Sequence, residues 1–170
     1  MKVKVKVKVK VKVKVKVRAT VKVTEISFYF NAPDKVTYAC RLLRKAVNAG
    51  AQVVVTGEPQ ALGQLDAALW TFSPLDFIPH CFGDASAGML AASPILLGSG
   101  AQIAAGALQG QILLNLGAQV PEGFERFERL MEIVGKEDEE KPLARARWKH
   151  YAHRGYALKR HDLTTLSAAG

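Results

Sequence analysis

Short apolar runs alternate with segments of helical periodicity through the first half of the chain. Residues 25–30 and 52–57 are brief and rich in aromatic and β-branched side chains, which predicts two strands. Apolar residues recur at helical spacing over 35–48, and a second helix is predicted over 59–70. A short third strand is predicted over 77–80. This strand–helix order indicates a parallel sheet built from crossover connections.

The second half of the chain is less regular. Apolar runs predict strands at 93–98 and 111–116, and the Gly- and Ala-rich segment 99–110 between them reads as a mobile loop or a long hairpin connection. A helix is predicted from Pro121 to Leu130, followed by a strand at 131–135. The prediction is one α/β domain, with a mostly parallel sheet flanked by helices.

Residue types that cap helices mark two of the predicted helices. Asp34 is placed to accept backbone N–H groups at the start of the first helix, and Gly50 follows its end. A last helix is predicted over 141–152, with Pro142 in its first turn and Gly155 at its stop.

The N-terminus has a different composition from the rest of the chain. Residues 2–17 are a strict Lys-Val repeat, which is typical of a disordered or artificial extension, or of an edge strand that binds polyanions or membranes. Residues 1–23 hold ten basic residues and no acid, so the other 147 residues carry fourteen basic and fifteen acidic residues. The net charge of +9 therefore comes from the extension, and it is no evidence for nucleic-acid binding. The domain is expected over 24–163, with a flexible C-terminus at 164–170.

The cysteines and the hydropathy pattern bear on cellular context. Cys40 and Cys81 are far apart and form no motif, so we expect both thiols to be reduced in a cytoplasmic protein. No run of about 18 apolar residues predicts a membrane span, and the basic start lacks the apolar segment of a secretion signal.

One stripe of the last predicted helix carries the strongest candidate site. At 100° per residue, Lys141, Arg145 and Trp148 share a face, and residues 141–162 hold seven Lys or Arg against one acid. Two cations beside an indole suit an acidic peptide that ends in an aromatic residue or a carboxylate. The alternative is a solvated basic helix whose Trp148 packs into the core.

Motifs for catalysis and cofactors are weak. The turn after the first strand has no glycine for a dinucleotide, and the glycine-containing segment 57–63 lacks the Gly-Lys-Ser/Thr of a phosphate loop. His80 and Cys81 are neighbours on a predicted strand, so their side chains should point to opposite faces. His150 and His153 have no further ligands to complete a metal set. We therefore expect no catalytic residue, cofactor or metal.

Three long segments carry a family resemblance. SFYFNAPD, LDAALWTFSPLDFIPH and KPLARARWKHYAHRGYAL, within residues 24–163, resemble the chi subunits of bacterial DNA polymerase III holoenzyme. The resemblance implies a Rossmann-like domain without catalytic activity that pairs with the psi subunit of the clamp-loader complex. It also implies binding to the acidic C-terminal tail of single-stranded DNA-binding protein, with DNA contacted only indirectly and no membrane.

The resemblance also implies site residues for that tail. Lysine, arginine and an aromatic residue of the family's last helix fall on Lys141, Arg145 and Trp148, although tyrosine is more frequent in the family at the last position. Four further positions of this chain match family residues in or near the tail-binding patch: Val134, Gly155, Trp70 and Phe77.

Two alternatives stay open at this point. The first is a small α/β enzyme with its site at the strand-end rim around His80, Cys81 and Asp84. The second concerns the extension alone, which could be a handle for polyanions or surfaces.

Overall fold

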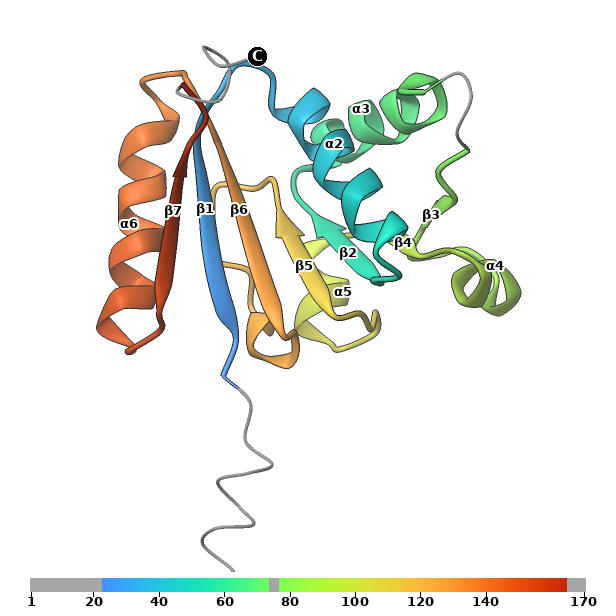
Figure 1. Cartoon of the computed structure of the whole chain (residues 1–170). Helices are drawn as coiled ribbons and strands as arrows, with labels where there is room; N and C mark the ends of the chain where they lie inside the picture. Colours follow the sequence, from blue (N-terminus) through green and yellow to red (C-terminus); the bar gives the residue numbers. More distant parts are fainter. Residues whose placement is uncertain (1–22, 74–76, 165–170) are drawn as a thin grey trace, which may run out of the picture.

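A seven-stranded parallel sheet forms the centre of the computed structural model, which describes residues 23–73 and 77–164. The Lys-Val repeat and the C-terminal residues 165–170 lie outside the described residues. The strands run in the order β3-β4-β2-β5-β6-β1-β7 (Figure 1). Their bounds are β1 Glu25–Ala32, β2 Val53–Thr56, β3 His80–Phe82, β4 Ile95–Gly98, β5 Ile112–Asn115, β6 Arg129–Gly135 and β7 Leu158–Asp162. The prediction of a Rossmann-like α/β domain is confirmed.

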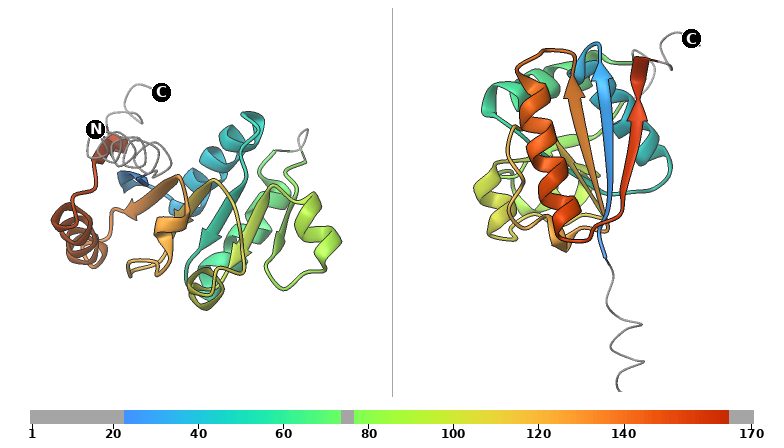
Figure 2. Two further views of the ribbon diagram at one scale, coloured as in Figure 1. Left: turned by 90° about the horizontal axis from the view of Figure 1, so that it is seen from below. Right: turned by 90° about the vertical axis from the view of Figure 1, so that its left-hand side faces the viewer.

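Helices cover both faces of the sheet. Helices α2 and α3 pack on one face, and α5 and α6 pack on the other (Figure 2). Beside the β3 edge lies the short helix α4 (Figure 1). The helix bounds are α2 Lys35–Asn48, α3 Pro59–Thr71, α4 Ala87–Ala92, α5 Gly100–Ala104 and α6 Glu140–His153, with a 3-10 turn, η1, at Phe124–Arg126.

The sheet separates two apolar cores. Every residue of β2, β4 and β5 is buried, as expected for parallel strands that are covered on both faces. Leu43 and Leu65 fill the core under α2 and α3, while Phe28 and Tyr151 fill the core under α6. The alternation of side chains along β1 sends Phe28 and Tyr29 into different cores.

The predicted helix ends are confirmed. The Asp34 carboxylate accepts the backbone N–H groups of Val36 and Thr37, at 3.0 and 3.2 Å, so it caps α2. Gly50 and Gly155 follow α2 and α6 with positive φ angles of 81° and 85°, a backbone conformation that glycine adopts without a Cβ clash.

Two predictions around the β3–β5 region are wrong. The third strand begins at His80 instead of ending there, because Pro79 has no N–H to donate to a ladder and pairing with β4 starts after it. Segment 99–110 is no hairpin connection, since β4 and β5 both pair with β2 in parallel. It contains α5, which begins with a capping box in which Ser99 and Gln102 bond each other's backbone N–H.

The region before and after α6 also differs from the prediction. The helix expected from Pro121 is only the η1 turn, because Gly123 takes a φ angle of 90°, outside the helical region. Leu130 belongs to β6. The pattern predicted neither α4 nor β7.

Candidate functional site: a cationic groove beside the last helix

Helix α6 presents two faces of opposite character. Ala144, Arg147 and Tyr151 face the sheet and are buried, whereas Lys141 and Arg145 are exposed on the other side. The exposed pair follows from the four-residue spacing, which returns to the same face after about one turn. The inner face therefore fixes the helix, and the outer face is available to a partner.

A buried carboxylate holds the inner face of α6. Glu132 on β6 is fully buried and accepts the Tyr151 hydroxyl at 2.7 Å, the Arg147 Nε at 3.2 Å and the Asn115 Nδ2 at 2.9 Å. Burial raises the pKa of Glu132, and the charge of Arg147 opposes that rise. Arg147 also donates to the Ala118 carbonyl at 2.9 Å. These bonds fix the rotation of α6 relative to the sheet.

A groove of about 420 Å³ opens between α6 and the last strand. We call it the cationic groove. Four of its lining residues are Lys or Arg, and no acid lines it. Its lining residues are Phe30, Asn31, Lys141, Arg145, Trp148, Lys149 and Arg160.

Aromatic rings form the apolar part of the groove. The half-buried Trp148 packs edge-on against Phe28, with ring centroids 5.1 Å apart, and also contacts Phe30 at 6.1 Å. The Arg160 guanidinium lies over the Phe30 ring, 5.0 Å from its centroid. Cations from α6 and β7 thus flank a surface on which a ligand's ring could pack.

The end of the groove is shaped by Asn31. This residue has a positive φ angle of 61°, which asparagine tolerates better than most residues, and its Nδ2 donates to Asp162 Oδ1 at 3.0 Å. That hydrogen bond lowers the pKa of Asp162. It also ties the end of β1 to the end of β7, so the strand that carries Arg160 is held beside the strand that carries Phe30.

The structure brings together three of the seven predicted site residues. Lys141, Arg145 and Trp148 line the cationic groove. Val134 is 1% exposed and lies in the core under α6, so its side chain cannot contact a ligand in this arrangement. Gly155 follows the far end of α6 and does not line the groove.

Trp70 and Phe77 lie elsewhere. Their rings contact each other at a centroid distance of 5.4 Å, and Trp70 contacts the ring of His80 on β3 at 4.9 Å. Five strands separate β3 from β7, so six spacings of about 4.8 Å place the two edges roughly 29 Å apart. Trp70 and Phe77 therefore do not lie beside the cations of the groove, because the sheet order separates the two regions.

Sequence reasoning missed Phe30 and Arg160 as site residues. Both lie on strands that pair, with Phe28 opposite Arg160 and Phe30 opposite Asp162. The cluster of cations in 141–162 was a signal for Arg160, but without a predicted β7 it could not be placed against β1.

The rim around His80 and Cys81 does not form a nucleophile–base pair. His80 Nε2 lies 3.0 Å from Asp66 Oδ1, and its Nδ1 lies 2.7 Å from the Ile78 carbonyl. The Cys81 thiol belongs to the opposite core and faces the Met89 carbonyl at 3.7 Å.

Within 23–73 and 77–164 no group of three His, Cys, Asp or Glu residues could hold a metal ion. None of the described helices is both long and apolar enough to span a bilayer.

Solved structures with a similar fold include a domain of a DEAD-box protein and a helicase domain. The C-terminal domain of the DEAD-box protein Dbp5 aligns with a TM-score of 0.55 and 11% identity, over 84% of this chain and 91% of that domain. The Pyrococcus furiosus Hef helicase domain aligns with a TM-score of 0.51 and 9% identity, over 66% of this chain and 27% of that one. At such low identity, these alignments show a shared fold alone.

Sequence comparisons are more specific. The family model for DNA polymerase III chi subunit, HolC, matches residues 23–159. DNA polymerase III subunit chi of Pseudomonas aeruginosa is 30% identical over 149 residues, which cover 85% of this chain and all of the relative. The Haemophilus influenzae subunit is 27% identical over 122 residues, which cover 71% of this chain and 81% of the relative. The chain therefore belongs to the family of DNA polymerase III chi subunits, accessory proteins of DNA replication.

Proposed function

We propose that the cationic groove binds the acidic C-terminal tail of single-stranded DNA-binding protein, and that the chain links this protein, through psi, to the clamp loader. The role is non-catalytic. The observation that carries the proposal is the groove itself, in which four cations flank the aromatic surface of Trp148 and Phe30. DNA would be contacted only through the single-stranded DNA-binding protein.

The groove suits a chain end that carries acidic residues and a terminal aromatic ring. A guanidinium such as that of Arg145 can hold a terminal carboxylate with two parallel hydrogen bonds. A ring that packs on Trp148 and Phe30 leaves water, which contributes roughly 1.5–3 kcal/mol when burial is complete. The surrounding exposed cations contribute less each and are screened by salt. The expected affinity is on the order of micromolar, which suits a transient contact.

The predicted site residues take different parts in this proposal. Lys141, Arg145 and Trp148 contact the tail directly, and Arg160 adds a second guanidinium from β7. Lys141 Nζ lies 3.3 Å from Asp138 Oδ1, an exposed pair that an incoming carboxylate can replace at small cost. Val134 supports the groove indirectly, because its side chain packs in the core beneath α6.

A linking protein needs a second surface, and the β3 edge offers one. Six large hydrophobic residues are exposed in the described part of the chain, and four of them lie along this edge. We call this surface the apolar edge, made of Trp70, Phe77, Phe82 and Met89. Exposed apolar side chains that gather in one place mark protein interfaces. We therefore assign the binding of psi to this edge, with Trp70 and Phe77 among the residues that contact it.

Fluorescence anisotropy tests the groove. The full chain is titrated against a labelled acidic peptide that ends in Asp-Ile-Pro-Phe, at two salt concentrations. Arg145→Ala should weaken binding about tenfold or more, because the carboxylate loses its bidentate partner. Removing the terminal Phe should weaken binding by a similar factor, and higher salt should weaken it in the wild type.

A matched variant controls for charge, because the ten basic residues of the extension attract any acidic peptide. Lys45→Ala removes one exposed cation from α2, away from the groove, and should leave the affinity within twofold. Equal losses in Arg145→Ala and Lys45→Ala would show that only net charge matters, and would refute the assignment of the tail to this groove.

A further inference from the structure

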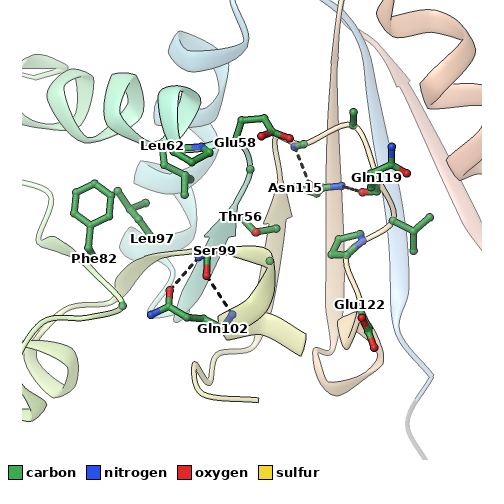
Figure 3. A pocket seen from close by; sticks show the side chains of 18 of the residues that line it. Thr56, Glu58, Leu62, Phe82, Leu97, Ser99, Gln102, Asn115, Gln119 and Glu122 are labelled. Atoms are coloured by element: carbon green, nitrogen blue, oxygen red, sulfur yellow. Dashed lines mark hydrogen bonds between the residues drawn. The ribbon is translucent and has the colours of Figure 1, made fainter. Parts of the chain in front are cut away.

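A second and larger cavity opens at the carboxyl ends of the central strands. Its volume is about 860 Å³, and it lies between the start of α3 and the loop that follows β5 (Figure 3). Carboxyl ends of parallel strands are where open α/β sheets hold small ligands. This cavity shares no lining residue with the cationic groove, so it lies outside the site proposed for the tail.

One hydroxyl that lines this cavity has no partner in the described chain. Thr56, the last residue of β2, is 4% exposed as a residue and lines the cavity, and its hydroxyl makes no hydrogen bond within the described chain. The neighbouring Asn115 side chain is fully engaged, since it donates to Glu132 and to the Gln119 carbonyl and accepts the Gly117 N–H. No fully buried polar side-chain atom of the described residues lacks a partner, so the Thr56 hydroxyl is open to the cavity, where a ligand can replace the water that it would otherwise bind.

The charge of the lining selects the ligand. Three carboxylates, of Glu58, Asp84 and Glu122, line the cavity, and no Lys, Arg or His does so. The positive end of α3 also points here, but the Glu58 carboxylate at the helix N-cap offsets it. Phosphate-bearing ligands are therefore disfavoured, and a ligand with positive charge is favoured.

The arrangement of side chains indicates an elongated ligand. Leu62, Phe82 and Leu97 lie on one side of the cavity and Glu122 lies on the other, with Thr56 between them and Glu58 at the start of α3 above Thr56 (Figure 3). The carboxylates are too dispersed to form a metal-binding group among the described residues. A flexible chain with spaced ammonium groups fits both features, because its methylene groups can pack on the apolar side.

We propose that this cavity binds an aliphatic polyamine. The methylene chain packs against Leu62, Phe82 and Leu97, the ammonium groups pair with the carboxylates, and one ammonium donates a hydrogen bond to the Thr56 hydroxyl. Phe82 belongs to both this cavity and the apolar edge, so the bound ligand would lie beside the proposed psi surface.

Isothermal titration calorimetry with spermidine at low salt tests the proposal on the full chain. The triple variant Glu58→Gln, Asp84→Asn and Glu122→Gln keeps the side-chain volumes and should bind at least about tenfold more weakly. Thr56→Val should bind about two- to fivefold more weakly. Glu25→Gln, an exposed change on β1 outside the cavity, is the control and should bind like the wild type.

Amide NMR shifts locate the bound spermidine without any variant. Shifts confined to Thr56, Gly83 and Gly117 support the cavity, and shifts centred on the acidic turn at 137–140 would overturn it. Equal affinity of wild type and triple variant would also overturn it, as would tighter binding of AMP than of spermidine. The lysines of the extension are present in every variant, so they do not bias the comparison. Tail-peptide binding to the triple variant should be unchanged, so the two sites are tested separately.

Discussion

The two edges of the sheet differ in chemistry although both are formed by single parallel strands. At the β7 edge, cations of α6 and β7 flank aromatic rings. A buried ion pair between Arg147 and Glu132 holds α6 against the sheet. At the β3 edge, a three-residue strand and its neighbours expose apolar side chains, and the polar contact of His80 with Asp66 is partly exposed at the carboxylate. One edge therefore suits an acidic peptide, and the other suits an apolar partner.

This difference determines how each contact should respond to salt. Attraction between exposed charges is screened within about 10 Å at 0.1 M ionic strength, whereas the transfer of apolar surface out of water is not weakened by ordinary salts. A protein with one edge of each kind could lose its acidic partner while keeping the apolar one.

The largest expected effect concerns the ion pair under α6. Arg147→Ala leaves Glu132 buried without its cation, and should lower the free energy of unfolding by about 3–5 kcal/mol. At the other edge, Asp66→Asn disturbs a partly exposed contact and should cost about 1 kcal/mol or less. Urea denaturation measures both. The double variant Glu132→Gln with Arg147→Met should recover most of the stability lost in Arg147→Ala. Equal losses of stability in Arg147→Ala and Asp66→Asn would show that the two edges do not differ in this respect.

A smaller effect is expected at the apolar edge. Trp70→Ala should weaken association with psi about 30-fold, roughly 2 kcal/mol, because a large exposed ring at an interface contributes far more than its neighbours. Binding of the acidic peptide should stay unchanged. Leu143→Ala truncates an exposed hydrophobic residue on α6 and is the matched control. Surface plasmon resonance against psi measures the affinity of each variant. Equal losses of affinity in Trp70→Ala and Leu143→Ala would refute the assignment of psi to this edge.

The smallest effect concerns the hydrogen bond that closes the groove. The Asn31 bond lowers the pKa of Asp162, so the stability it contributes is present above the ordinary pKa and is lost as the pH falls through the lowered value. Asn31→Ala should raise the pKa of Asp162, although the hydrogen bonds from Thr164 remain to lower it. An NMR titration of the carboxyl carbon measures it. No change would show that Asn31 does not hold β7 at this end.

The sequence was most informative for elements whose start, periodicity and end are all marked by local residues. Asp34, the apolar spacing of 35–48 and Gly50 predicted α2 with its bounds. Segment 99–110 was misread because its many Ala and Gly residues show no clear period, although Ser99 and Gln102 were a capping signal. Strand β7 was missed because it is an exposed edge strand, LKRHD, without an apolar run.

Only the part of the site that lies on one element could be predicted from the sequence. Lys141, Arg145 and Trp148 lie on one helix, so their spacing placed them on one face. Phe30 and Arg160 are 130 positions apart, and only the pairing of β1 with β7 brings them together. Trp70 and Phe77 lie away from the groove because strand order, which no local pattern encodes, places β3 at the far edge.

The carboxylate of Glu132 has a consequence for the thermodynamics of recognition. Because Tyr151 and Arg147 bind it on successive turns of α6, the helix does not need to become ordered when a ligand arrives. The conformational entropy lost on association then belongs mainly to the flexible tail and to the long exposed side chains that meet it. Amide protons on the inner turns of α6 should accordingly exchange with solvent only when the whole domain opens, with or without the tail.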